Sequence, residues 1–152
     1  MPEPLKVYIA SSWRNEEHQQ LVALMRAHGF DVYDFRNAET ATTWAKMGLP
    51  HLWSTSDFLQ CLKHPEAERA FQSDDKALRD CDICILALPC GRSAHLEAGL
   101  AMGAGKFTLI YLGDKWDGEP ELTYKMADGI VVSQNQLVAA CRSYRTEVAN
   151  CG

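Results

Sequence analysis

Residues 82–88 read DICILAL, an apolar run with no polar side chain after its opening aspartate. A short run of this kind, without alternating polar positions, is typical of a strand that is covered on both faces. Such strands occur in parallel sheets, where crossover helices pack against either side. The segment therefore predicts that this chain folds around a buried parallel sheet.

Strand and helix patterns alternate through the rest of the sequence, as the crossovers of a parallel sheet require. Gly29 is predicted to end the first helix, and Asn15 and Ser133 are predicted N-caps of the first and last helices. The 152 residues fit one domain, residues 1–152, so we expect an α/β domain with helices on both faces of a five-stranded parallel sheet. The predicted strands cover 5–10, 30–35, 82–88, 107–112 and 129–132, and the predicted helices cover 16–28, 66–80, 93–104 and 134–148.

The charge balance and the apolar pattern exclude several classes of function. The formal net charge is −5, so a broad basic surface for nucleic acid is not expected, and any anion site must be local. No apolar run approaches the length that spans a bilayer, and the opening segment MPEPLKVYIASS lacks the pattern of a signal peptide. The six cysteines lack the spacing of a disulfide scaffold, which favours reduced thiols. We expect a cytoplasmic protein that contacts neither a membrane nor nucleic acid.

Two short polar loops, residues 11–15 and 89–93, follow the first and third predicted strands. Ligands of open parallel sheets bind outside the carboxyl ends of the strands, near the point where the strand order reverses. Each loop leads into a helix N-terminus, where backbone N–H groups and an arginine can hold an anion. A capped loop with an exposed arginine explains either loop alone, but the pair favours a binding site. Gly91 is expected to allow an unusual turn and Ser93 to cap the helix. The candidate binding residues are Ser11, Ser12, Trp13, Arg14, Gly91, Arg92 and Ser93.

Glu97 is a carboxylate within a helix of small and apolar residues, and residues 93–105 hold no lysine or arginine that could pair with it. A capping box needs the acid three residues after the cap, whereas Glu97 is four residues after Ser93. A first-turn acid favoured by the helix dipole is an alternative. Because a buried carboxylate without a partner is costly, a functional role is favoured. Glu97 is expected to share a buried stripe with Ser93, Leu100, Ala101 and Ala104.

Other motifs carry weaker signals. Cys81 and Cys84 form a C-x-x-C pair at a strand entrance, but no second pair completes a zinc site, so buried thiols are favoured. The histidines lack metal-ligand spacing, and the chain has neither a G-x-G-x-x-G motif nor a P-loop. No metal or other cofactor is therefore expected. Trp44, Trp53 and Phe58 can stack on a base, or can pack as core or lid.

Three stretches carry a resemblance to a known family: VYIASSWRN, SDDKALRDCDICILAL and GRSAHLEAGLAMGAGKFTLIYL. Asp74 lies eight residues before Asp82, which opens the third strand; Glu97 is followed by a small residue and a glycine; and Gly-Lys stands at 105–106. These features resemble the nucleoside 2-deoxyribosyltransferase family, including its members that hydrolyse nucleoside 5′-monophosphates. The resemblance covers most of the chain.

The resemblance implies a flavodoxin-like three-layer sandwich, usually oligomeric, with active sites near subunit contacts. It implies that Glu97 is the nucleophile and that Asp74 lies near the sugar and the leaving base. These residue types suit the chemistry, because a carboxylate beside C1′ can trap an oxocarbenium-like state as a covalent ester. A second acid can then protonate or steer the leaving base.

The chain departs from the transferases where CGRSAH replaces their Asp/Gly-rich loop. Arg92 and Ser93, with Ser11, Ser12 and Arg14, suit a phosphate. The sequence therefore predicts cleavage of the N-glycosidic bond of a nucleoside or nucleoside 5′-monophosphate, with release of the free base. Transfer of deoxyribose between bases, NAD glycohydrolase activity and a non-catalytic nucleotide-binding sensor are the alternatives. A homodimer or a higher homo-oligomer is expected.

Overall fold

The structure is a computed structural model that describes residues 2–38, 41, 44, 47, 54–113 and 116–152. The strands of these residues form one parallel sheet of order β2-β1-β3-β4-β5. This is the strand order of flavodoxin-like folds, and it confirms the predicted α/β architecture. The strands are β1 (Lys6–Ala10), β2 (Asp31–Tyr33), β3 (Ile83–Ala87), β4 (Phe107–Tyr111) and β5 (Gly129–Val131).

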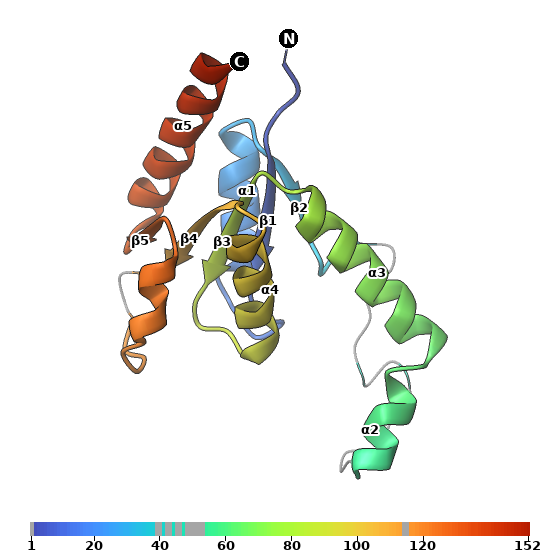
Figure 1. Ribbon diagram of the computed structural model, residues 1–152. Helices are drawn as coiled ribbons and strands as arrows, with labels where there is room; N and C mark the ends of the chain where they lie inside the picture. The colour runs from blue at the N-terminus through green and yellow to red at the C-terminus, as the bar shows by residue number, and fades with distance from the viewer. Residues whose placement is uncertain (1, 39–40, 42–43, 45–46, 48–53, 114–115) are drawn as a thin grey trace.

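Helices cover both faces of the sheet (Figure 1). On one face lie α1 (His18–Ala27) and α5 (Gln134–Cys151). On the other face lie α3 (Pro65–Asp80) and α4 (Arg92–Gly103). The expected three-layer sandwich is therefore confirmed, with every residue of β3 buried between the two helical layers.

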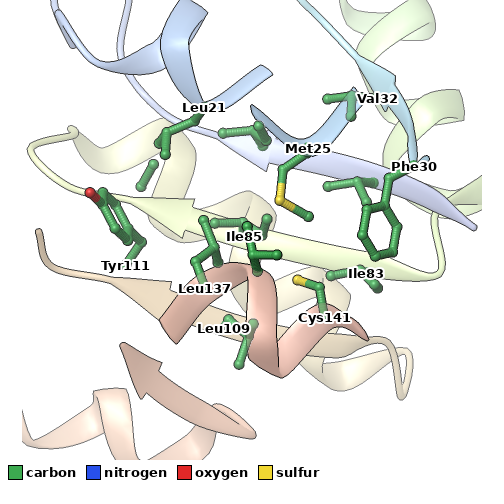
Figure 2. Close-up of a cluster of buried hydrophobic side chains, with 14 of the residues drawn as sticks. Leu21, Met25, Phe30, Val32, Ile83, Ile85, Leu109, Tyr111, Leu137 and Cys141 are labelled. Atoms are coloured by element: carbon green, nitrogen blue, oxygen red, sulfur yellow. The ribbon is translucent and has the colours of Figure 1, made fainter. Parts of the chain in front are cut away.

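The side chains of β1 alternate between two apolar clusters, as the period of a strand requires. Val7 and Ile9 point toward α1 and α5, whereas Tyr8 and Ala10 point toward α3 and α4. Figure 2 shows part of the first cluster, where residues of α1, β2, β3, β4 and α5 meet: Leu21, Met25, Val32, Ile83, Ile85, Leu109, Leu137 and Cys141. The core thus fixes which strand positions face each helical layer.

Glycines end two of the helices that frame the sheet. Gly29 follows α1 with φ +82° and Gly105 follows α4 with φ +77°, a region that favours glycine because it has no Cβ. The predicted end of the first helix at Gly29 is confirmed. Ser133 caps α5 as predicted, since its hydroxyl accepts a hydrogen bond from the Gln136 N–H.

The first helix begins later than the sequence predicts. The residue preceding α1 is Glu17, so Asn15 is not the N-cap. The Asn15 side chain instead accepts a hydrogen bond from the Glu17 N–H, which closes an Asx turn before the helix. The turn competes with capping for the same side-chain oxygen.

Two helical segments occur where the sequence shows no regular pattern. One is α2 (Thr55–Cys61), which begins at a capping box formed by Ser54 and Asp57. The other is the 3-10 helix η1 (Leu122–Met126), which lies between β4 and β5. Both are short, and their apolar residues do not recur with a long helical period, which explains why the pattern missed them.

None of the helices in the described part of the chain is long and apolar enough to cross a membrane. The cysteines are all unpaired, and Cys81 and Cys84 of the C-x-x-C motif are buried. Within the described ranges no three His, Cys, Asp or Glu side chains converge on a point that could hold a metal.

Candidate active site

The loops after β1 and β3 lie side by side at the carboxyl edge of the sheet. The two strands are neighbours in parallel register, and the Asn15 amide donates a 3.2 Å hydrogen bond to the carbonyl of Ala87. This edge is also where the strand order reverses, since β2 lies on one side of β1 and β3 on the other. The predicted position of the two loops at the carboxyl edge is therefore correct, and their role in binding stays a prediction.

Glu97 lies in the second turn of α4, on the face toward the sheet, and its side chain is half-buried. Burial, together with the negative charge of Asp74, raises the pKa of Glu97 to about 7. A hydrogen bond with the Tyr8 side chain acts in the opposite direction and lowers the pKa. A carboxylate with this pKa exchanges its proton near neutral pH, as acid–base and nucleophilic groups in active sites do.

A second carboxylate, Asp74 of α3, is held by a tyrosine. The Tyr33 hydroxyl donates a 2.8 Å hydrogen bond to Oδ1 of Asp74 and lies 2.9 Å from the Ser73 hydroxyl. Burial raises the pKa of Asp74, and the hydrogen bond from Tyr33 opposes that effect. Burial likewise raises the pKa of Tyr33 to about 12, so this phenol remains a donor near neutral pH.

The two tyrosines connect the carboxylates through the sheet. Tyr8 and Tyr33 are paired in the register of β1 and β2, and their rings stack at 5.7 Å with an angle of 12°. Burial is the main cause that raises the pKa of Tyr8, with Glu97 and Asp74 adding to it. Tyr8 therefore stays protonated beside Glu97, and the four side chains form one acid–phenol cluster, which we define as Glu97, Tyr8, Tyr33 and Asp74.

Tyr8, Tyr33 and Ser73 were not among the site residues predicted from the sequence. A signal for the tyrosines was present, because each follows a valine in a strand segment, KVYIA or DVY. A phenol inside a sheet usually finds a hydrogen-bond partner, so it points to a polar group on the facing helix. Nothing in the sequence alone indicated which groups these partners are.

A cavity of about 530 Å³ adjoins the acid–phenol cluster. Asp74 lines it, and so does Ser93, which lies one helical turn before Glu97 on α4. Trp13 from the β1 loop lines it too, so three of the predicted site residues share this cavity. The remaining lining is mostly apolar and comes from Trp44, Met47, Leu62, Ala67, Glu68, Ala70 and Phe71. Trp44 is thus placed where a planar ring could stack, Phe58 does not line the cavity, and Trp53 lies outside the described residues.

The N-terminus of α4 differs from the prediction in three respects. Gly91 rather than Ser93 is the N-cap, and Ser93 lies inside the first turn. Gly91 has a φ of −97°, and a Cβ there would meet no atom within 4 Å, so the turn does not require glycine. The alternative of Glu97 as a first-turn acid also fails, because the helix starts at Arg92 and Glu97 lies in its second turn.

The predicted buried stripe of α4 is only partly correct. The helix buries Ala94, Ala98 and Ala101 against the sheet, and Glu97 lies half-buried at the margin of this face. Ser93, Leu100 and Ala104 are exposed. The helix is oriented with its alanine side chains toward the sheet. These small side chains let its backbone lie close to β1 and β3.

The loop after β1 is held in place by its own hydrogen bonds and by Arg36. The Ser12 hydroxyl accepts from the Arg14 N–H, and the Arg36 guanidinium donates to the carbonyls of Ser12 and Asn15, each at 2.7 Å. Ser11 turns toward α1 and contacts His18. The side chains of Arg14 and Arg92 are exposed, and neither forms an ion pair with another described residue.

Comparison with known proteins identifies the fold. No protein-family model and no curated protein sequence matches the chain. A 2-deoxyribosyltransferase from Bacillus psychrosaccharolyticus matches with a TM-score of 0.57 and 16% identity, over 88% of this chain and 90% of that one. A conserved protein from Enterococcus faecalis V583 gives 0.61 and 12%, over 93% and 99%. The CMP N-glycosidase BcmB from Clostridium botulinum gives 0.51 and 17%, over 91% and 98%. The chain thus has the fold of a 2-deoxyribosyltransferase and of a nucleotide N-glycosidase, and the predicted resemblance is confirmed at the level of the fold.

Proposed function

We propose that this protein is an N-glycosidase that cleaves the bond between sugar and base in a nucleoside or a nucleoside 5′-monophosphate. The observation that carries the proposal is the half-buried carboxylate of Glu97, whose pKa is raised to about 7 in part by Asp74, a second carboxylate that lines a mostly apolar cavity. The fold shared with a CMP N-glycosidase and a 2-deoxyribosyltransferase supports the same chemistry.

In the proposed reaction, ionised Glu97 attacks C1′ of the sugar and the C1′–N bond breaks. The electron pair of that bond leaves with the base nitrogen, which takes a proton from Asp74. Water then adds to C1′ of the glycosyl ester and releases Glu97, and the proton of the water restores Asp74. The pKa of both carboxylates is raised, so the pair can share one proton close to neutral pH, and the reaction starts from the form in which Asp74 carries that proton.

The binding residues are assigned on the same basis. The apolar cavity lined by Trp13 suits a planar base, and Arg92 and Ser93 at the start of α4 suit a 5′-phosphate, with Arg14 from the neighbouring loop. Ser12 and Gly91 shape these loops through backbone contacts. No cofactor takes part in the proposed reaction.

Transfer of deoxyribose to a second base is the other candidate, and the fold match to a 2-deoxyribosyltransferase favours it. Both reactions share the first half, and they differ in whether water or a base accepts the sugar. Incubation with a panel of nucleosides and nucleotides, with and without an added free base, separates them by chromatography of the products. We expect release of free base without an acceptor; a new nucleoside formed only with added base would establish transfer.

The nucleophile is tested with Glu97→Gln, which keeps the size of the side chain. We expect base release to fall by about three orders of magnitude or more. Glu147→Gln, an exposed position on α5, is the matched control. Full activity of Glu97→Gln would exclude the covalent step, and clean binding of nucleotides without any base release would leave a binding module.

We also propose that the protein forms a homo-oligomer through the helices that project from the sheet (Figure 1). Large apolar side chains of α2 and α3 are exposed, with Leu59 at 54% and Phe71 at 62%. Large apolar side chains that are exposed on neighbouring helices are candidates for a subunit contact. Sedimentation of the wild type and of Phe71→Ser is the test, and a wild-type monomer at micromolar concentration would contradict the proposal.

A further inference from the structure

Three polar side chains form a chain from the core to the edge of the candidate site. The Ser11 hydroxyl lies 2.6 Å from Nδ1 of His18, and Nε2 of His18 lies 3.1 Å from Oδ1 of Asp34. The His18 side chain has 0% exposure and that of Asp34 has 3%, whereas Ser11 is only partly buried at the carboxyl end of β1. The proposed glycosidic mechanism uses neither His18 nor Asp34.

The Asp34 carboxylate is surrounded by hydrogen-bond donors and acts as an acceptor toward them. It accepts from the side chains of His18, Gln19 and Asn37 and from the Arg36 N–H. Burial raises the pKa of Asp34, but these hydrogen bonds outweigh burial and bring the pKa below its ordinary value. An ionised carboxylate has no hydrogen to donate, so Nε2 of His18 must carry the hydrogen between them.

The state of His18 then follows from its surroundings. Burial lowers the pKa of His18, and the charge of Arg36 acts in the same direction, whereas the hydrogen bond that His18 donates to Asp34 and the charge of Asp34 oppose them. The ring is therefore neutral near pH 7, and with its hydrogen on Nε2 it presents a bare lone pair at Nδ1. The hydrogen bond of 2.6 Å between Ser11 and Nδ1 must use the hydrogen of the Ser11 hydroxyl.

The direction of this hydrogen bond decides what Ser11 can recognise, because its oxygen has only lone pairs left for a ligand. We propose that Ser11 is a specificity-determining residue that accepts a hydrogen bond from a sugar hydroxyl of the substrate, an inference that rests on the proposed glycosidic function. Phosphate oxygens are acceptors and gain no hydrogen bond from such a serine. Ser11 therefore leaves the set of phosphate-binding residues that the sequence predicts.

Ser11 is assigned to the sugar from its place in the chain. It stands three residues after Tyr8, which contacts the proposed nucleophile, and two before Trp13, which lines the apolar cavity, and Ser11 itself does not line that cavity. The sugar is the part of a nucleoside that joins the reacting carbon to the base. His18 and Asp34 act through Ser11 and are positioning residues. The ring of His18 is itself held against Phe35, which packs edge-on against Trp13.

The first test measures the tautomer directly and needs no substrate. In uniformly ¹⁵N-labelled wild-type protein, two-bond ¹H–¹⁵N correlation spectra report which ring nitrogen of His18 carries the hydrogen. The ring is assigned by through-bond correlation to its own backbone. We expect hydrogen on Nε2 and a bare Nδ1 at about pH 7. Hydrogen on Nδ1 would leave Ser11 free to donate and would overturn the proposal.

The second test combines Ser11→Ala with substrates that lack single sugar hydroxyls. We expect Ser11→Ala to lower kcat/KM by roughly two- to tenfold, the range of a neutral hydrogen bond. The loss should vanish for the 2′-deoxy or the 3′-deoxy analogue, whichever lacks the recognised hydroxyl, because the interaction is then already absent. It should be equal with and without a 5′-phosphate. Ser11→Thr, which keeps the hydroxyl, should restore activity, and Ser143→Ala on the exposed face of α5 is the control.

Two outcomes would overturn the inference: an equal loss for every analogue, or a loss confined to phosphorylated substrates. Calorimetric affinities for the same analogues separate this result from a failure of the proposed function. If no compound releases a base, the glycosidase proposal fails. The dependence of affinity on Ser11 and on each hydroxyl then still decides whether Ser11 accepts a hydrogen bond from the sugar.

Discussion

The Tyr33 hydroxyl on β2 donates a 2.8 Å hydrogen bond to Oδ1 of Asp74 on α3. The Tyr33 ring also stacks on Tyr8 of β1, whose side chain contacts Glu97 on α4. Each of the two neighbouring strands therefore contributes one phenol, and each phenol contacts one carboxylate: Tyr8 contacts Glu97, and Tyr33 contacts Asp74. Burial raises the pKa of both carboxylates, and each phenol lowers the pKa of its own carboxylate, so the tyrosines shift the pH range over which the pair keeps a single proton.

If the proposed function holds, the wild-type protein has a bell-shaped dependence of kcat/KM on pH. The proposed reactive form has one proton on the pair, so activity falls when the last proton leaves near pH 7 and, at more acid pH, when a second proton binds. Initial rates of base release in a series of constant ionic strength measure both limbs. Activity that only rises through pH 7 would show that Asp74 steers the base by charge and donates no proton.

Asp74→Asn should lower base release by about 10²- to 10⁴-fold, the usual contribution of a general acid. The substitution also removes the negative charge that raises the pKa of Glu97, so the remaining activity should rise with pH through a value below 7, without the alkaline fall. Asp75→Asn is the matched control, because Asp75 pairs with Arg79 on the surface of the same helix. Equal losses in the two variants would mean that the effect comes from α3 and not from the chemistry.

The two tyrosines should move opposite limbs of the pH profile. Tyr8→Phe removes the hydrogen bond that lowers the pKa of Glu97, so the alkaline limb should move to higher pH. Tyr33→Phe removes the bond that lowers the pKa of Asp74, so the acid limb should move to higher pH. Tyr144→Phe on α5 is the control for loss of a phenol. A uniform drop in rate without a shift of either limb would assign the tyrosines a packing role only.

Much of this arrangement could be predicted because it depends on local signals. Strand segments such as 82–88 owe their pattern to burial on both faces, and Gly29 and Ser133 mark helix ends through backbone geometry and capping. The parallel order of the strands then places the loops after β1 and β3 at one edge. These rules need only residues that are close in the sequence or an ordering that the crossovers impose.

The parts that could not be predicted depend on contacts between distant residues. The bond between Tyr33 and Asp74 joins positions 41 residues apart, and the contact of His18 with Asp34 joins positions 16 apart. Ser93 has a local preference for the N-cap position, but α4 starts at Arg92 and packs its alanines against the sheet. Tertiary packing overrides such preferences, because they amount to about 1 kcal/mol.

The phosphate is expected to be recognised at the start of α4. Arg92→Ala should lower kcat/KM for a nucleoside 5′-monophosphate by about tenfold while leaving the nucleoside unchanged, since a charged hydrogen bond to phosphate is lost. Arg142→Ala, another exposed arginine on α5, controls for the change in net charge. If the monophosphate and the nucleoside lose the same activity, Arg92 acts on the fold of the loop and the phosphate lies elsewhere.

The raised pKa of Glu97 also predicts how stability depends on pH. The pKa is about 7 in the folded protein and 4.5 ordinarily, so between these values the native state binds more protons than the unfolded chain. Stability should therefore fall as pH rises from about 4.5 to about 7 and then level off. Glu97→Gln removes the charge and should stabilise the protein by about 1–3 kcal/mol at about pH 8, with little effect at about pH 4.5. Urea unfolding of Glu97→Gln, of the exposed control Glu147→Gln and of the wild type at both pH values measures this difference. A gain of equal size at both pH values would trace the effect to packing and not to the buried charge.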